Sequence, residues 1–230
     1  MWSRLRLGCL SLALLLPLAS AASAATLGID VGVGAGTPIH ITPDLVEISP
    51  GIFTSSDSLT VTGSFELTWD LHLEGDPLIS GSFTLHNLSP STQPFTVGAT
   101  LGVLALPAPT LMGGSVGNVI YTDLSDDGVT LSAAPFYEAR IDGSTVQSLG
   151  SFVLGPASGV RPIESWGVPI PSAPGPGVTS SIGVAFAFSL TGLDKVETPF
   201  AFEVVPVPEP ASGALLALGL VGLQITRRRR

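Results

Sequence analysis

Apolar and polar residues alternate along much of the chain. The longest run extends from Leu59 to Leu73, where apolar residues and Gly63 take every second position and polar residues stand between them. A two-residue period puts the two sets on opposite faces of a β-strand, so that one face packs inward and the other meets water. The run predicts either one long, bent strand or two strands broken near Gly63.

Shorter alternating segments follow, separated by Gly, Pro, Asn and Asp. Residues 137–141 and 144–149 flank Asp142-Gly143, a dipeptide that suits the left-handed backbone of a hairpin turn. The 154–177 segment holds six prolines and is predicted to be a long irregular connection. Other strands are predicted at 79–85, 95–103, 119–122, 129–131, 182–190 and 200–204. We therefore expect an all-β domain over residues 58–206, an antiparallel β-sandwich of jelly-roll-like form.

The composition agrees with many short strands and excludes several kinds of chemistry. The chain of 230 residues is 45% hydrophobic and only 12% charged, and it contains 27 Gly and 20 Pro. Such a share of turn-forming residues disfavours a helical bundle. The single cysteine, Cys9, lies in the N-terminal leader, so the domain has neither a disulfide framework nor a thiolate for a metal or a nucleophile.

Charge is distributed unevenly. Between the two termini only Arg140, Arg161 and Lys195 are basic, against all 18 acidic residues. We call the chain between the two terminal segments the body. A body this acidic is repelled by phosphate backbones, so nucleic acid is excluded as a partner.

The first 24 residues have the parts of a secretory signal peptide. Arg4 and Arg6 supply the positive region, and residues 7–19 form an apolar core too short for a membrane span. Ala22-Ser23-Ala24 is the predicted cleavage site for signal peptidase, with the small residues Ala22 and Ala24 recognised; Ala19-Ser20-Ala21 is the alternative.

Residues 25–57 are predicted to be a Gly/Pro-rich leader into the domain. Gly32, Gly34 and Gly36 stand at alternate positions, but Thr37-Pro38 follows, so no helix begins there. A phosphate-binding loop needs a helix N-terminus after its glycines. The segment is therefore interpreted as a mobile or extended leader that binds no cofactor.

Two motifs in the body resemble functional sites. Gly113 to Gly117 matches the G-x-S-x-G nucleophile elbow, but the three histidines all precede Ser115, opposite to the order of that triad. Asp123, Ser125 and Asp127 match the first half of a calcium loop, since oxygens at alternate positions can surround a hard cation. Ala134 stands where the bidentate Glu of such a loop is expected, so calcium is a weak candidate and an acidic turn is favoured.

The remaining candidates are histidines and tryptophans. His72 and His86 lie on the polar phase of their strands and are interpreted as exposed strand residues rather than zinc ligands. Trp69 is on the apolar phase and is predicted to belong to the core, whereas Trp166 or Tyr137 could stack on a sugar. We predict no catalytic residue and no cofactor.

The C-terminal residues 207–230 combine three physically different pieces. Val207, Pro208, Glu209 and Pro210 make a break that a strand cannot cross. Residues 211–226 are an uncharged apolar run, about 24 Å long as a helix, which can span a bilayer core of about 30 Å if the membrane thins. The chain then closes on the cationic membrane stop Arg227, Arg228, Arg229 and Arg230. Positive residues stay cytoplasmic, so the single transmembrane helix places the body outside.

This tail resembles the PEP-CTERM sorting signal of Gram-negative bacteria. The resemblance rests on V-P-E-P, the Leu/Ala/Gly-rich run and the terminal arginines, together with the N-terminal signal peptide. It implies a substrate of exosortase, a membrane enzyme that cuts near the Pro-Glu-Pro motif and releases or transfers the body. Proteins with this tail are varied and are often associated with exopolysaccharide and biofilm.

The sequence thus predicts a non-enzymatic protein that crosses the inner membrane, is anchored there transiently, and is then sorted to the cell surface or extracellular matrix. The alternative is a secreted carbohydrate-binding module or glycan-active enzyme with a jelly-roll fold. A third class is a permanently anchored membrane protein, which fractionation distinguishes from the first.

Overall fold

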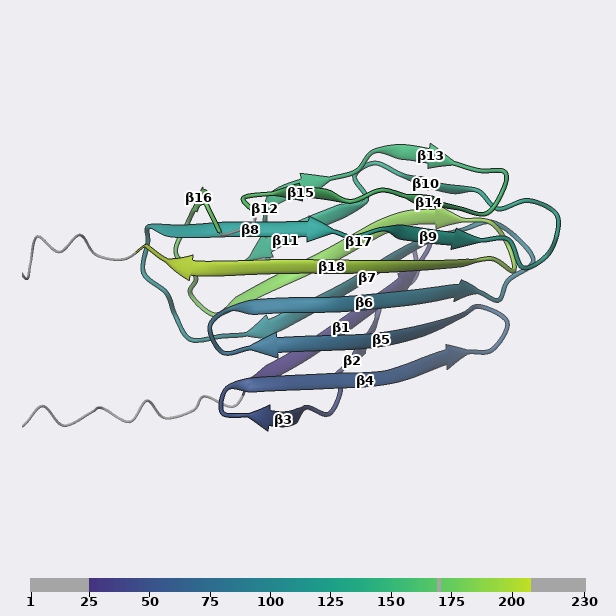
Figure 1. Ribbon diagram of the computed structural model, residues 1–230. Coiled ribbons are helices and arrows are strands. Elements are labelled where there is room, and N and C mark those ends of the chain that lie inside the picture. The colour runs from purple at the N-terminus through teal and green to yellow at the C-terminus, as the bar shows by residue number, and fades with distance from the viewer. Residues whose placement is uncertain (1–24, 169–170, 208–230) are drawn as a thin grey trace, which may run out of the picture.

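The protein is described by a computed structural model, which covers residues 25–168 and 171–207. The described residues contain no helix, and their strands form two antiparallel sheets (Figure 1). The predicted signal peptide, the apolar run 211–226 and the terminal arginines lie outside the described residues. The all-β, antiparallel part of the fold prediction is confirmed.

The first sheet has eight strands. Its main path runs β12-β11-β17-β7-β1-β2, and β10 and β13 join it at the side of β17. The bounds are β1 Thr26–Val33, β2 Ile39–Ile41, β7 Gln93–Gly102, β10 Leu131–Ala133, β11 Tyr137–Ile141, β12 Ser144–Leu149, β13 Phe152–Leu154 and β17 Ser181–Leu190.

The second sheet has ten strands, in the order β14-β9-β18-β6-β5-β4-β3, and β8, β15 and β16 extend it beside β18. The bounds are β3 Val46–Ser49, β4 Ile52–Val61, β5 Phe65–Glu74, β6 Leu78–Asn87, β8 Thr110–Val116, β9 Val119–Thr122, β14 Gly159–Arg161, β15 Glu164–Trp166, β16 Ala173–Gly175 and β18 Lys195–Pro206. Strands β3 to β6 are a meander of neighbours, whereas a jelly roll is built from two Greek keys. The jelly-roll-like part of the prediction is therefore not confirmed.

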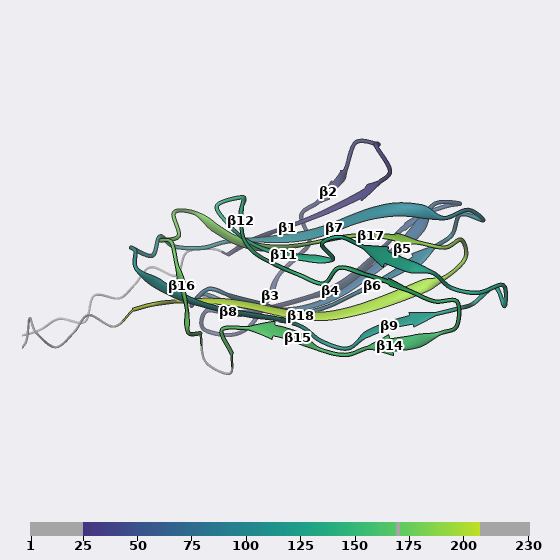
Figure 2. The ribbon, with the colours of Figure 1, turned by 90° about the horizontal axis from the view of Figure 1, so that it is seen from above.

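The two sheets lie in separate layers with the core between them (Figure 2). The alternating residues of β5 point into this core, and Leu67 and Leu73 are completely buried. Phe83 of β6 meets Phe186 of β17 edge to face, with ring centroids 5.9 Å apart. Trp69 is also buried and donates its indole N–H to Ser55 at 3.2 Å, as its place on the apolar phase predicts.

The longest alternating run is two strands. Strand β4 ends at Val61 and β5 begins at Phe65, and the chain reverses through Gly63, which has a φ of 71°. Of the two alternatives that the pattern left open, the hairpin is the one that forms. The predicted hairpin at Asp142-Gly143 is also present, since β11 pairs with β12.

Two segments depart from the prediction. The leader of residues 25–57 is part of the β-domain, because β1 pairs with β7 along its whole length and buries Leu27, Ile29 and Val31. The 154–177 segment carries the short strands β14, β15 and β16, which pair with β9 and β8. In both segments Gly and Pro weaken the local pattern, and pairing with distant strands supplies the structure.

Candidate functional site: the exit of the tail and the acidic loop

Strand β18 holds the chain in the sheet up to the predicted sorting motif. Val204 is completely buried and donates its N–H to the Pro77 carbonyl at 2.9 Å. Pro206 pairs with Thr110 of β8, and Val207 donates to the Pro109 carbonyl at 3.3 Å. The first residue of the motif is therefore bonded to the folded body, while Pro208, Glu209 and Pro210 lie outside the described residues.

The chain enters and leaves the body at the same end. Thr26, the first residue of β1, pairs with Gly102, and Pro206, the last of β18, pairs with Thr110. Residues 102 and 110 are the two ends of the loop between β7 and β8, so β1 begins and β18 ends on one side of the molecule (Figure 1). We call this side the exit end, formed by residues 74–77, 103–109, 203 and 206–207.

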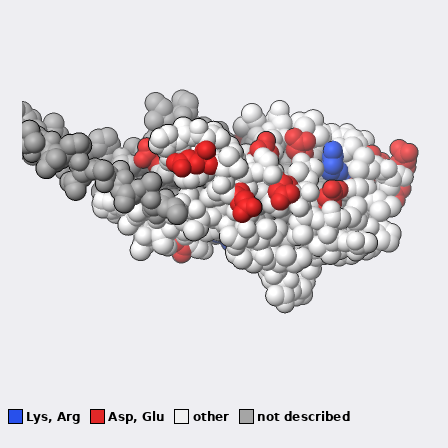
Figure 3. All heavy atoms as spheres, turned by 90° about the horizontal axis from the view of Figure 1, so that it is seen from below, with Lys and Arg blue, Asp and Glu red and all other residues white. Residues whose placement is uncertain are grey.

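Acidic side chains gather at the exit end. Burial raises the pKa of Glu203, and the negative charges of Glu74 and Asp76 raise it further. Like charges disfavour ionisation of a neighbouring carboxyl group, so these three side chains lie close enough for their charges to repel one another. Acidic side chains also outnumber basic ones on the face that Figure 3 shows.

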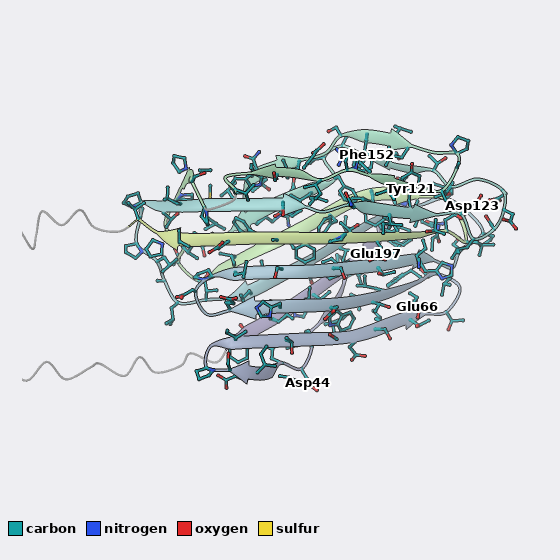
Figure 4. The ribbon with its side chains drawn as sticks, viewed as in Figure 1. Asp44, Glu66, Tyr121, Asp123, Phe152 and Glu197 are labelled. Atoms are coloured by element: carbon teal, nitrogen blue, oxygen red, sulfur yellow. The ribbon has the colours of Figure 1, made fainter. Side chains whose placement is uncertain are left out.

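The acidic loop lies at the opposite end of the body, where Figure 4 labels Asp123. One oxygen of Asp123 accepts the N–H groups of Ser125 and Asp126, at 3.2 and 2.8 Å, and the other accepts that of Gly128 at 2.9 Å. The Ser125 hydroxyl lies within hydrogen-bond reach of both Asp123 and Asp127. The predicted side chains thus do converge, and they shape a turn between β9 and β10.

A third carboxylate that the sequence analysis missed joins this loop. One oxygen from each of Asp123, Asp127 and Asp194 lies within 4.8 Å of the others. Asp194 comes from the turn between β17 and β18, is completely buried, and accepts the Leu124 N–H at 3.1 Å and the Thr191 hydroxyl. No spacing rule links it to a loop some 70 positions earlier, so only the strand pairing reveals it.

These contacts define what the acidic loop can do. Carboxylate oxygens are the ligands that calcium takes, but each of the three carboxylates already accepts hydrogen bonds from the chain itself. Ala134, at the position of the missing Glu, offers no side-chain oxygen. The geometry therefore accounts for the cluster as a self-satisfied acidic turn.

The other candidates are separated by the fold. Ser115 lies within strand β8, where it pairs with Ala201 and Ser165, rather than on a strand-to-helix turn. His72 is opposite Ser80, and His86 is opposite Glu66 at the far end of the same strand pair. The nucleophile elbow and the two-histidine zinc site, which the sequence analysis rejected, are thus not assembled.

The prediction that Tyr137 or Trp166 could stack on a sugar needs correction. Tyr137 is completely buried, its hydroxyl donates to the Ala201 carbonyl at 3.3 Å, and burial raises its pKa. It therefore has no face for a ligand. Trp166 packs its ring against Phe202, with centroids 6.0 Å apart, and is partly buried.

A groove of about 460 Å³ does open on the outer face of the first sheet. Its floor consists of small residues of β7 and β17, including Gly98 and Ala185. Asp30 stands on one rim and the Glu138–Arg140 ion pair on the other, with Arg140 Nη2 2.6 Å from the Glu138 carboxylate. The groove thus offers polar rims around an apolar floor.

The tail is the part of the chain that comparison with known proteins identifies. The PEP-CTERM protein-sorting motif matches residues 206–230, which confirms the resemblance drawn from the sequence. No curated protein matches the chain. Within residues 25–168 and 171–207 there is no helix long and apolar enough to cross a membrane.

Proposed function

We propose that this chain, which carries the PEP-CTERM protein-sorting motif at its C-terminus, is an exported protein that exosortase sorts to the cell surface or extracellular matrix. The observation that carries the proposal is the position of the motif. Its match begins at residue 206, where β18 ends, so a complete β-domain precedes a separate sorting signal. Cleavage near Pro208-Glu209-Pro210 would leave every described strand intact.

The charges of the chain support the same route. The four arginines that close the sequence favour a cytoplasmic C-terminus, and the acidic body then lies on the outer side. Signal peptidase removes residues 1–24 after Ala24, and residues 211–226 hold the precursor in the inner membrane until exosortase acts.

The body acts without catalysis in this proposal, in association with exopolysaccharide or biofilm. What supports a non-enzymatic body is the placement of its candidate residues: Ser115 lies in a strand, the histidines are apart, and the acidic loop satisfies its own carboxylates. An acidic, two-layered domain suits a structural component of a hydrated matrix.

Fractionation of host cells tests the sorting proposal. In cells with exosortase we expect the body at the cell surface or in the matrix, and in cells without the enzyme we expect it in the membrane pellet. Recovery in the membrane pellet from both strains would instead identify a permanently anchored protein.

Carbohydrate binding is the second candidate function, and the groove on the first sheet is the observation that favours it. Charged and hydroxyl side chains at its rims can bond to sugar hydroxyls, although Trp166 and Tyr137 lie elsewhere. Binding on a glycan array should be lost in Arg140→Ala and kept in Trp166→Ala. Absence of any glycan signal from the intact protein would reject this candidate.

A further inference from the structure

The connection between the body and the membrane segment is very short. Val207 is bonded to Pro109, and only Pro208, Glu209 and Pro210 separate it from the apolar run that begins at Ala211. Three fully extended residues reach about 10 Å. An enzyme that grips these residues beside the bilayer therefore works within about 10 Å of the folded body.

An enzyme is much wider than that distance. A standard protein interface covers about 800 Å² of each partner, a patch nearly 30 Å across. A peptide cleft closed around Pro208 to Pro210 would overlap the exit end unless β18 came apart first. Fraying is opposed, because Phe202 and Val204 are completely buried and β6 and β8 both pair with this part of β18.

We propose that exosortase docks on the exit end, so that the folded body is part of the recognised substrate. The contact surface consists of the exposed turn residues Gly75 and Asp76, the exposed loop at Pro107 to Pro109, and the partly buried Glu203. This inference rests on the proposed sorting function and adds the surface through which the partner binds.

Charge gives the chemistry of that partner. A cleft that accepts Glu209 needs a cation or several hydrogen-bond donors for its carboxylate. Glu74, Asp76 and Glu203 present the same sign at the exit end, whereas Lys195 lies at the other end of β18 and the charge of Arg140 is paired with Glu138. An enzyme surface that is basic around its cleft is complementary to Glu209 and to the acidic exit end. Such complementarity acts mainly on the rate of association.

The first test neutralises the exit end. We expect the full-length triple variant Glu74→Gln, Asp76→Asn and Glu203→Gln to be processed about tenfold more slowly in exosortase-bearing cells, measured by pulse-chase. The matched control is Asp57→Asn, Glu66→Gln and Glu197→Gln, which removes the same charge from strands away from the exit; Figure 4 labels Glu66 and Glu197. The control should be processed at the wild-type rate.

The second test moves the exit end away from the sorting motif. A flexible Gly/Ser spacer between Pro206 and Val207 keeps residues 207–230 intact and should itself slow processing, and the triple variant should then have no further effect. Equal rates for wild-type, triple-variant and spacer chains would overturn the docking surface. Slowing by the control triple to the same extent would do so as well. A wild-type chain that is not processed in these cells would instead refute the sorting function, which distinguishes the two failures.

Discussion

Single residues tie together parts of this fold that are far apart in sequence. Asp142 occupies the hairpin turn between β11 and β12 with a φ of 49°, and Gly143 follows at 77°. Its carboxylate accepts the N–H groups of Thr179, Ser180 and Ser181, at 2.8, 2.8 and 3.0 Å, and so fixes the start of β17. The sequence predicts the turn from Asp-Gly, but not this second role.

Asp142 should make stability depend on pH in acid. Burial acts to raise its pKa, but the three backbone donors and the Ser180 hydroxyl outweigh it and lower the pKa from 3.8 to about 2. A lowered carboxyl pKa contributes stability above the unfolded value, and that stability is lost as the pH falls through about 2.

We expect Asp142→Ala to lower the free energy of unfolding by about 1 kcal/mol at pH 7, since solvent screens this largely exposed carboxylate. Urea unfolding should show the difference shrinking between pH 4 and pH 2. Asp44→Asn, in an exposed loop, serves as the control. A difference that stays constant down to pH 2 would show that the carboxylate charge is not responsible.

Gly81 occupies a position in the second sheet that has no room for a side chain. It lies in β6 between β5 and β18 with a φ of 141°, and an added Cβ would meet the Asp70 carbonyl and lie 2.9 Å from the Leu71 Cα. Gly81→Ala should destabilise the domain by about 2–4 kcal/mol.

Gly51 provides the comparison for that variant. It has a φ of 77° but open space around it, so Gly51→Ala should cost only about 1 kcal/mol. Denaturant midpoints measure both variants. Equal losses would mean that backbone strain alone, and not the contact with β5, makes Gly81 necessary.

At the scale of elements, the strands with strong alternation were predictable. Strands β5, β7 and β17 each bury every second residue, and a local pattern of that strength needs no knowledge of the partner strand. Strand β1 also alternates, but the residues between its apolar positions are Gly28, Asp30 and Gly32, which are of types uncommon in strands. Its place in the sheet is decided by β7, more than 60 residues away.

The acidic loop likewise combines residues that the local sequence predicts with one that it does not. Asp123, Ser125 and Asp127 were found from their spacing, since one turn brings alternate residues together. Asp194 was not, because it arrives through the pairing of β17 and β18 with the rest of the fold. A site assembled from two loops can be only half predicted from a single sequence.

We expect the acidic loop to bind no calcium at millimolar concentration. Its carboxylates already accept bonds from the N–H groups of Ser125, Gly128 and Leu124, and the twelfth position is Ala134. Isothermal titration calorimetry of the intact protein should show no binding heat. Heat that disappears in Asp194→Asn would establish a metal site in this loop.

At the scale of the whole molecule, the body and the tail meet at a sharp boundary. Both ends of the body lie on the exit end, so the two proposed processing steps would act on the same side of the domain. The tail was predictable because its signal is linear: a break, an apolar run and terminal arginines. The exit end was not, because its acidic residues come from β18, from the end of β5 and from the turn that follows β5.

Mass spectrometry of the C-terminal peptide is the most direct test of the central claim, that exosortase removes the tail. The protein would be isolated from cells with and without exosortase and mapped at both termini. We predict that chains from exosortase-bearing cells end near Pro208-Glu209-Pro210, and that chains from cells without the enzyme end at Arg230. An intact tail in the exosortase-bearing cells would contradict the account.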